Sequence, residues 1–87
     1  MTRDHVLAVV KKHLMDTVED LTEDKIDPAK SMKELGANSL DIVEVVSSAM
    51  RELKVKIPRS ELSKLANIDQ LVDMLIKVAG EGGGAQA

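Results

Sequence analysis

Aliphatic side chains recur every three or four residues in three segments of this chain, which is the spacing of amphipathic α-helices. The first segment follows Thr2, a residue suited to cap a helix. The second spans about residues 39–53, and the third begins at Asn67 and ends at Gly80. The residues expected to share a face are Val6, Val9, Val10, His13 and Leu14 in the first segment, Ile42, Val43, Val45, Val46, Ala49, Met50 and Leu53 in the second, and Ile68, Leu71, Val72, Leu75 and Ala79 in the third. The pattern therefore predicts three helices, each burying one face, with His13 partly buried and hydrogen-bonded.

Two connectors join the predicted helices. The longer one, residues 16–38, is acidic, and a connector of this length needs anchors to the core. Its expected anchors are Leu21, Ile26, Met32 and Leu35. The other, residues 54–66, contains Pro58, which suits the first turn of a short helix whose Leu62 and Leu65 face inward. We therefore expect an all-α four-helix bundle with three longer helices, one short helix and a long first loop. Residues 1–79 form the expected domain, and residues 80–87 a flexible Gly-rich tail.

Composition excludes several classes of function. The 87 residues include no Cys, which excludes disulfides and thiol catalysis, and no aromatic residue, which excludes a base-stacking platform. A net charge of −3 disfavours nucleic-acid binding. Two histidines, and an acidic stretch without the order of an EF-hand loop, lead us to expect no bound metal. There is neither a long apolar run nor a signal-peptide pattern, so we expect a cytoplasmic protein that does not enter a membrane.

Residues 34–44 are the one segment whose pattern indicates a chemical site. Asn38 is a good helix N-cap, which places Ser39 at the first helical position and Asp41 at the third. The Ser39 hydroxyl is then not needed for capping, and it projects from the positive end of a helix dipole, which favours an anion such as phosphate. A catalytic serine would need a base, but His5 and His13 lie on the first predicted helix and no Gly-x-Ser-x-Gly elbow is present. The residues alone also fit a plain helix cap.

The whole string resembles the acyl carrier protein family over about residues 3–79. The resemblance is carried by Leu35-Gly36-Ala37-Asn38-Ser39-Leu40-Asp41, by Glu44, and by Ile57-Pro58 before a short helix. It implies that the chain is a carrier and not an enzyme. A phosphopantetheinyl transferase would attach 4′-phosphopantetheine from coenzyme A to Ser39, and the thiol of that arm would carry acyl groups as thioesters.

The resemblance also implies partners and a surface that they recognise. The partners would be the transferase and an acyltransferase, ketosynthase or other polyketide or fatty-acid enzyme, and the carrier would be a monomer. Leu40, Asp41, Val43 and Glu44 match partner-recognition positions. Periodicity instead assigns Val43 to the core, and it places Leu40 on the polar face of its helix.

Departures from the family pattern bear on the pathway. Asn38 replaces the commoner Asp, Met32 and Leu53 stand where aromatic residues are usual, and Arg51, Lys54 and Lys56 add positive charge to an otherwise acidic region. We therefore expect Arg51 to take part in partner choice. These features favour a polyketide-type carrier, including a free-standing carrier of a β-branching cassette. The alternatives left open are a fatty-acid carrier, a peptidyl or D-alanyl carrier, and a helical interaction module without a prosthetic group.

Overall fold

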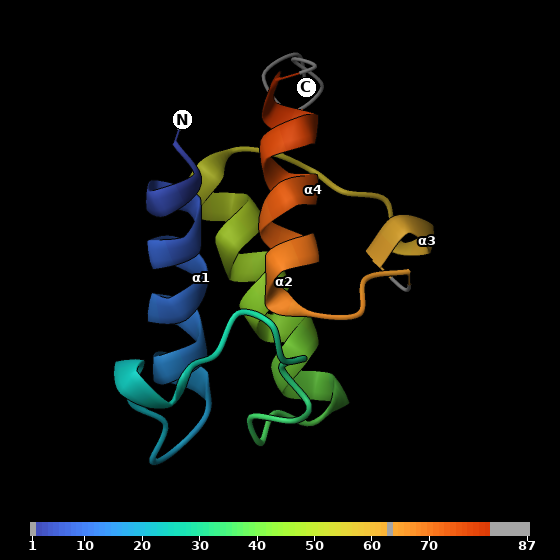
Figure 1. Ribbon diagram of the computed structural model, residues 1–87. Coiled ribbons are helices and arrows are strands. Elements are labelled where there is room, and N and C mark those ends of the chain that lie inside the picture. Colours follow the sequence, from blue (N-terminus) through green and yellow to red (C-terminus); the bar gives the residue numbers. More distant parts are fainter. Residues whose placement is uncertain (1, 63, 81–87) are drawn as a thin grey trace.

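The computed structural model describes residues 2–62 and 64–80, and the described chain is helical without strands (Figure 1). The helices are α1 (Arg3–Thr17), a 3-10 turn η1 (Glu23–Lys25), α2 (Ser39–Leu53), α3 (Arg59–Leu62) and α4 (Ile68–Gly80). This confirms the predicted all-α fold with three longer helices, one short helix and a long first connector. Residues 81–87 of the predicted tail lie outside the described residues, and Gly80 closes α4.

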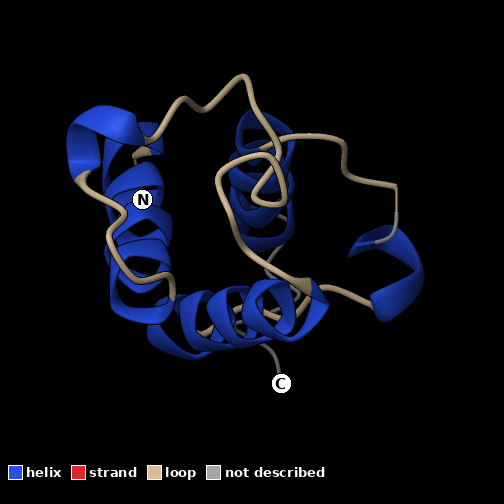
Figure 2. Cartoon of the chain, turned by 90° about the horizontal axis from the view of Figure 1, so that it is seen from below, coloured by secondary structure: helices blue, strands red, loops and turns tan. Residues whose placement is uncertain are grey.

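The three long helices surround a common interior (Figure 2). Helix α1 runs opposite to α2 and α4 and packs against both, whereas the short α3 stands to one side of the bundle (Figures 1 and 2). Residues 18–38 cross the end of the bundle at which α2 and α4 begin. The loop carbonyls of Lys30 and Pro28 accept hydrogen bonds from Ile68 N and Asp69 N at 3.1 and 2.9 Å. Loop backbone thereby satisfies donors that the first turn of α4 cannot pair internally.

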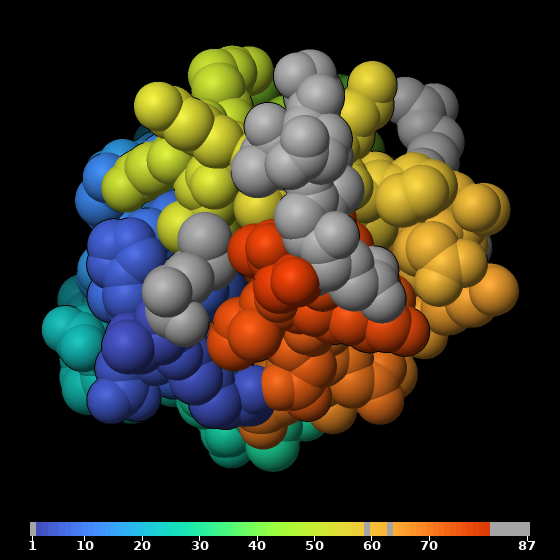
Figure 3. All heavy atoms as spheres, turned by 90° about the horizontal axis from the view of Figure 1, so that it is seen from above, coloured from blue at the N-terminus to red at the C-terminus, as the bar shows by residue number. Residues whose placement is uncertain are grey.

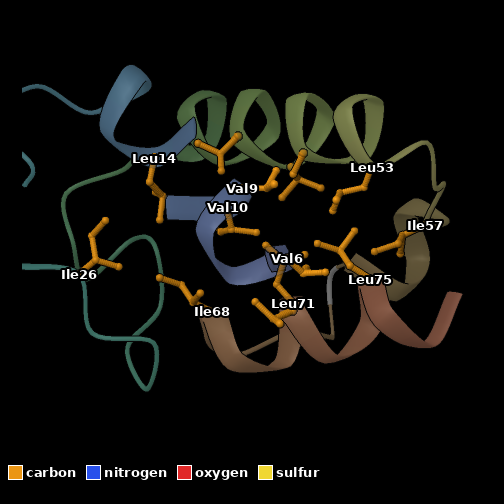
Figure 4. Packing of buried hydrophobic residues seen from close by; sticks show 14 of the residues in the cluster. Val6, Val9, Val10, Leu14, Ile26, Leu53, Ile57, Ile68, Leu71 and Leu75 are labelled. Atoms are coloured by element: carbon orange, nitrogen blue, oxygen red, sulfur yellow. The ribbon is translucent and has the colours of Figure 1, made fainter. Parts of the chain in front are cut away.

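The core consists of aliphatic side chains (Figure 4). Each long helix contributes a buried stripe: Val6, Val9, Val10 and Leu14 from α1, Val45, Val46, Ala49 and Leu53 from α2, and Ile68, Leu71, Val72 and Leu75 from α4. No polar side chain is fully buried in the described part of the chain. Removal of this apolar surface from water is the main force that holds the helices together.

The connectors are pinned by their own apolar residues. Ile26 is buried, as predicted, while Leu21, Met32 and Leu35 pack against the core and stay partly exposed. Val18 and Ala37, which the pattern did not single out, are also buried. In the second connector Ile57 is buried beside Leu53 and Leu75 (Figure 4), and Leu62 and Leu65 are half-buried, as predicted.

Charged side chains tie α1 to α4. Thr2 caps α1 by accepting a hydrogen bond from His5 N at 3.1 Å, which confirms the predicted N-cap. Arg3 then pairs with Asp69 at 2.7 Å and with Asp73. Figure 3 shows the first turn of α1 lying beside α4. At the start of α4, Asn67 Oδ1 accepts a hydrogen bond from Gln70 N at 2.8 Å, but the Gln70 side chain accepts from Ala66 N, one residue earlier than a capping box requires.

Helix α2 also positions the residues of interest, because both of its ends are fixed locally. Its last residue is followed by Lys54 in the left-handed conformation, whose N–H donates to the Met50 carbonyl.

Among the described residues, no helix is long and apolar enough to cross a bilayer.

Candidate functional site

A complete capping box starts α2. Asn38 Oδ1 accepts a hydrogen bond from Asp41 N at 2.8 Å, and Asp41 Oδ2 accepts one from Asn38 N at 3.1 Å. Asn38 has extended backbone geometry, so the helix begins at the next residue. This confirms the predicted cap, and it makes Ser39 the first residue of α2.

The segment before the cap is a tight turn that depends on one glycine. Gly36 has φ +106°, a conformation that L side chains rarely adopt. A Cβ at this position would meet Val18 Cγ1 at 3.7 Å, an ordinary contact, so glycine is needed here for its backbone angle and not for space. The next residue, Ala37, is buried, and its N–H donates to the Met32 carbonyl at 3.0 Å. The turn therefore fixes the entry into α2.

Ser39 is exposed, and its hydroxyl forms no hydrogen bond within the described residues. The cap is made by Asn38, so the Ser39 hydroxyl is available to react with an external partner. The structure does not give it a histidine base from within the chain. His13 Nε2 lies 2.8 Å from Glu52 Oε1, and Glu52 is thirteen residues further along α2, about 20 Å along the axis. A serine-nucleophile arrangement is thus absent from the described part of the chain, whereas the position at the helix N-terminus suits an anion.

Two large apolar side chains next to Ser39 face solvent. Leu40 is 80% exposed, which confirms its predicted place off the core face. Val43 is 57% exposed, so the prediction from periodicity that Val43 is a core residue was wrong. The apolar arc of α2 is wider than the surface that α1 and α4 cover, and Val43 lies beyond its covered part, at the edge of a cavity. Glu44 is exposed and accepts a hydrogen bond from Ser48 Oγ at 3.3 Å.

The charges along α2 differ between its two ends. Near the C-terminal end Arg51 is exposed, and Glu52 pairs with Lys12 and His13 of α1, each at 2.8 Å. The hydrogen bond from Lys12, and then that from His13, lower the pKa of Glu52. His13 is only 18% exposed, so the expectation of a partly buried, hydrogen-bonded histidine is confirmed. Glu52 is held against α1 by these pairs. The exposed acidic side chain of α2 that remains is therefore Glu44, near Ser39, whereas the exposed charge near the C-terminal end is the positive Arg51.

A cavity of about 850 Å³ opens beside Ser39, between α2, α3 and the segment that leads into α4. Its walls are mainly apolar and include Ile42, Val46 and Met50 of α2 and Leu62 of α3. Sequence reasoning missed this cavity. The signal that could have indicated it is the shortness of the helix after Pro58, because one turn covers too little of the wide apolar arc of α2.

The described site thus brings together four of the predicted residues, Ser39, Leu40, Val43 and Glu44, on one exposed stretch of α2. Asp41 is half-buried and committed to the capping box. Arg51 lies three turns further along the same helix, so it is separate from this stretch.

Comparison with known proteins gives concordant results. The family model described as "Phosphopantetheine attachment site" matches residues 12–75. The polyketide biosynthesis acyl-carrier-protein AcpK of Bacillus subtilis (strain 168) is 31% identical over 75 residues, 86% of this chain and 92% of that protein. An acyl carrier protein of Chlorobium phaeobacteroides is 31% identical over 74 residues, 80% of this chain and 95% of that protein.

Among solved structures, the chain matches the crystal structure of the curacin biosynthetic pathway HMG synthase in complex with an acetyl donor-ACP. The match has a TM-score of 0.76 at 32% identity, and it covers 91% of this chain and 99% of the other.

Proposed function

The chain belongs to the acyl carrier protein family, whose prosthetic group is phosphopantetheine, and from this premise we propose that Ser39 is the attachment residue. The observation that carries the proposal is the exposed Ser39 hydroxyl, which the Asn38–Asp41 capping box leaves unused at the first position of α2. The residues present fit the group. A phosphodiester at Ser39 would lie at the positive end of the helix dipole, and the adjoining cavity could accommodate part of a long arm.

Attachment would proceed by transfer from coenzyme A. The Ser39 oxygen forms a bond to the phosphorus that bears the pantetheine, the pyrophosphate P–O bond breaks, adenosine 3′,5′-bisphosphate leaves, and a base of a phosphopantetheinyl transferase takes the hydroxyl proton. When bound, the group supplies a terminal thiol that holds acyl units as thioesters, a function for which this chain has no cysteine. The chain's own part is to hold the Ser39 oxygen at a rigid, exposed helix start.

We infer that the chain acts as a carrier on which enzymes work, and not as an enzyme. Its partners would be a phosphopantetheinyl transferase and acyltransferases, ketosynthases or related pathway enzymes, with the chain itself a cytoplasmic monomer. Leu40, Val43 and Glu44 are exposed around Ser39 and would touch any enzyme that reaches the arm. Asp41 would support them by fixing the helix start, and Arg51 would select among partners by charge.

We further propose that the pathway is polyketide biosynthesis, with the chain serving as a free-standing carrier in a β-branching cassette. The similarity to a polyketide carrier and to an acetyl donor-ACP bound to an HMG synthase supports this. The positive charge of Arg51 in the last turn of α2 supports it too, because Arg51 departs from the acidic pattern of fatty-acid carriers.

The test is modification of the recombinant chain with coenzyme A and a transferase of broad specificity, followed by intact mass measurement. The parent should gain one phosphopantetheinyl unit, and Ser39→Ala should gain none while keeping the parent's circular dichroism spectrum. Ser47→Ala is the matched control, because Ser47 lines the same cavity from two turns further along α2 and should be modified normally. Modification of Ser39→Ala would refute the assignment. A folded parent that is not modified would favour a helical interaction module without a prosthetic group.

A further inference from the structure

The cavity beside Ser39 has cationic side chains at its edge but no acidic ones. Its charged lining residues, within the part of the chain that the structure describes, are Lys33 and Lys56, and none is Asp or Glu. The chain as a whole carries 15 acidic and 12 basic residues, so the cavity has the opposite bias to the protein. An anion entering this cavity would meet an attractive local field in an otherwise acidic molecule.

The two lysines lie in the connectors at opposite ends of α2. Lys33 belongs to the turn before α2, where its carbonyl accepts a hydrogen bond from Gly36 N at 3.1 Å, close to Ser39 in the sequence. Lys56 adjoins Ile57, whose N–H donates to Met50 Sδ at 3.1 Å. Met50 lies eleven residues after Ser39, so the Lys56 end is about 16 Å along the axis of α2.

Neither lysine is paired with a carboxylate of the described residues. Lys12 and Lys64 form ion pairs with Glu52 and Glu61, but no ion pair joins Lys33 or Lys56 to any residue within 2–62 and 64–80. As far as the described residues are concerned, both ammonium groups are therefore open to an anion from outside that part of the chain.

The chemistry between the lysines restricts what could occupy the cavity. Ile42, Val46, Met50 and Leu62 offer apolar walls that suit methylene groups. A carboxylate among such walls would be unfavourable unless a cation met it. The cavity therefore combines an apolar middle with a free cation at its far end.

We propose that this cavity accepts the acyl group carried on Ser39 when that group ends in a carboxylate, with Lys56 as the counter-ion. The substrate class is the short dicarboxylic half-thioester, and the proposal rests on the proposed attachment at Ser39. Lys33, at the other end, lies on the side of the phosphodiester. Both lysines are exposed, so the ion pair confers a modest preference and leaves the acyl group free to depart.

The experiment compares two acyl groups of nearly equal shape. The chain is loaded with succinyl-phosphopantetheine, and separately with its 4-methylpentanoyl counterpart, in which an isopropyl group replaces the carboxylate. Intact mass first verifies loading at Ser39. Amide chemical shifts of Met50, Lys56 and Ile57 are then recorded, and the succinyl carboxylate, labelled with carbon-13, is titrated on the protein and on free pantetheine.

The expected result is that succinyl shifts the amides around Lys56 more than 4-methylpentanoyl does. A nearby cation favours the charged form, so the carboxylate pKa should be lower on the protein than on free pantetheine, by about 0.2–0.7 pH unit for an exposed pair. Lys56→Gln should remove the difference and Lys56→Arg should retain it. Lys64→Gln is the matched control, because Lys64 is exposed, pairs with Glu61 and does not line the cavity, and it should behave as the parent.

Equal amide shifts from both acyl groups, or an unchanged carboxylate pKa, would overturn the inference while leaving attachment at Ser39 intact. A shift that persists in Lys56→Gln would likewise overturn it. Failure to load at the first step would instead refute the proposed function, and the inference with it.

Discussion

Truncation of Leu40 can separate partner recognition from stability, because this large apolar side chain is exposed beside Ser39. Leu40 is 80% exposed, so Leu40→Ala removes side-chain atoms of which about a fifth were shielded from water. Complete burial of a leucine side chain contributes about 1.5–3 kcal/mol, so the expected loss in the free energy of unfolding is about 0.3–0.6 kcal/mol. Leu71→Ala is the matched control, because Leu71 is 1% exposed and its truncation should cost about 2–5 kcal/mol.

Urea unfolding followed by circular dichroism measures both losses in free energy. In a separate thermal unfolding experiment, the melting temperature of Leu40→Ala should fall by no more than about 5 °C. Transfer kinetics supply the other half of the test. Because Leu40 directly follows Ser39, an enzyme that reaches the arm must approach this side chain. Loss of an apolar interface anchor costs more than about 1 kcal/mol, which corresponds to a fall of about fivefold or more in kcat/KM for loading or unloading by a partner enzyme.

Leu40→Ala should therefore show nearly normal stability with slowed transfer, and two results would refute this expectation. A stability loss near that of Leu71→Ala, with normal transfer, would place Leu40 in the core. Normal stability with normal transfer would show that no tested partner uses this side chain.

Three further changes, one at the N-cap of α2 and two within the helix, have expected outcomes. Asn38→Ala removes a cap and should lower the free energy of unfolding by about 1 kcal/mol in urea, and an unchanged midpoint would contradict the capping role. Because the folded-state pKa of Glu52 is lowered, its contact with α1 stabilises the chain above the ordinary value of 4.5 and is lost as pH falls below it. Glu52→Gln should thus be less stable than the parent at neutral pH, with the difference shrinking as pH falls below 4.5, and a constant difference would argue against the linkage. Arg51→Glu should change the free energy of unfolding by no more than about 0.5 kcal/mol, because Arg51 is exposed. It should raise turnover with fatty-acid synthase enzymes and lower it with the cognate polyketide enzyme, with smaller effects at high salt. Equal turnover of mutant and parent at low salt would show that Arg51 does not select partners.

The start of α2 is the part of the site that the sequence by itself determined. Asn38, Ser39 and Asp41 lie within four residues, and the capping bonds that place the serine join residues three apart. Interactions of this range form wherever the local backbone allows, so residue types and spacing were sufficient to predict the helix start and the unused hydroxyl. The helical faces of Val6, Val10 and Leu71 were likewise predictable, since periodicity reports which residues share a face.

Only the tertiary structure decided which residues of those faces are buried, which are exposed and which form ion pairs. Periodicity placed Val43 with the core residues, but the pattern of one helix does not show how much of its surface the neighbouring helices cover. In the structure, α1 and α4 leave Val43 uncovered. Glu52 contacts Lys12 and His13, which lie 40 and 39 positions earlier in the sequence, so only the packing of α1 against α2 brings these charges together. Lys33 and Lys56 come from different connectors, yet both line the same cavity. Their common location depends on where the short α3 ends and how the long loop crosses the bundle, because contacts between segments distant in the sequence form the cavity.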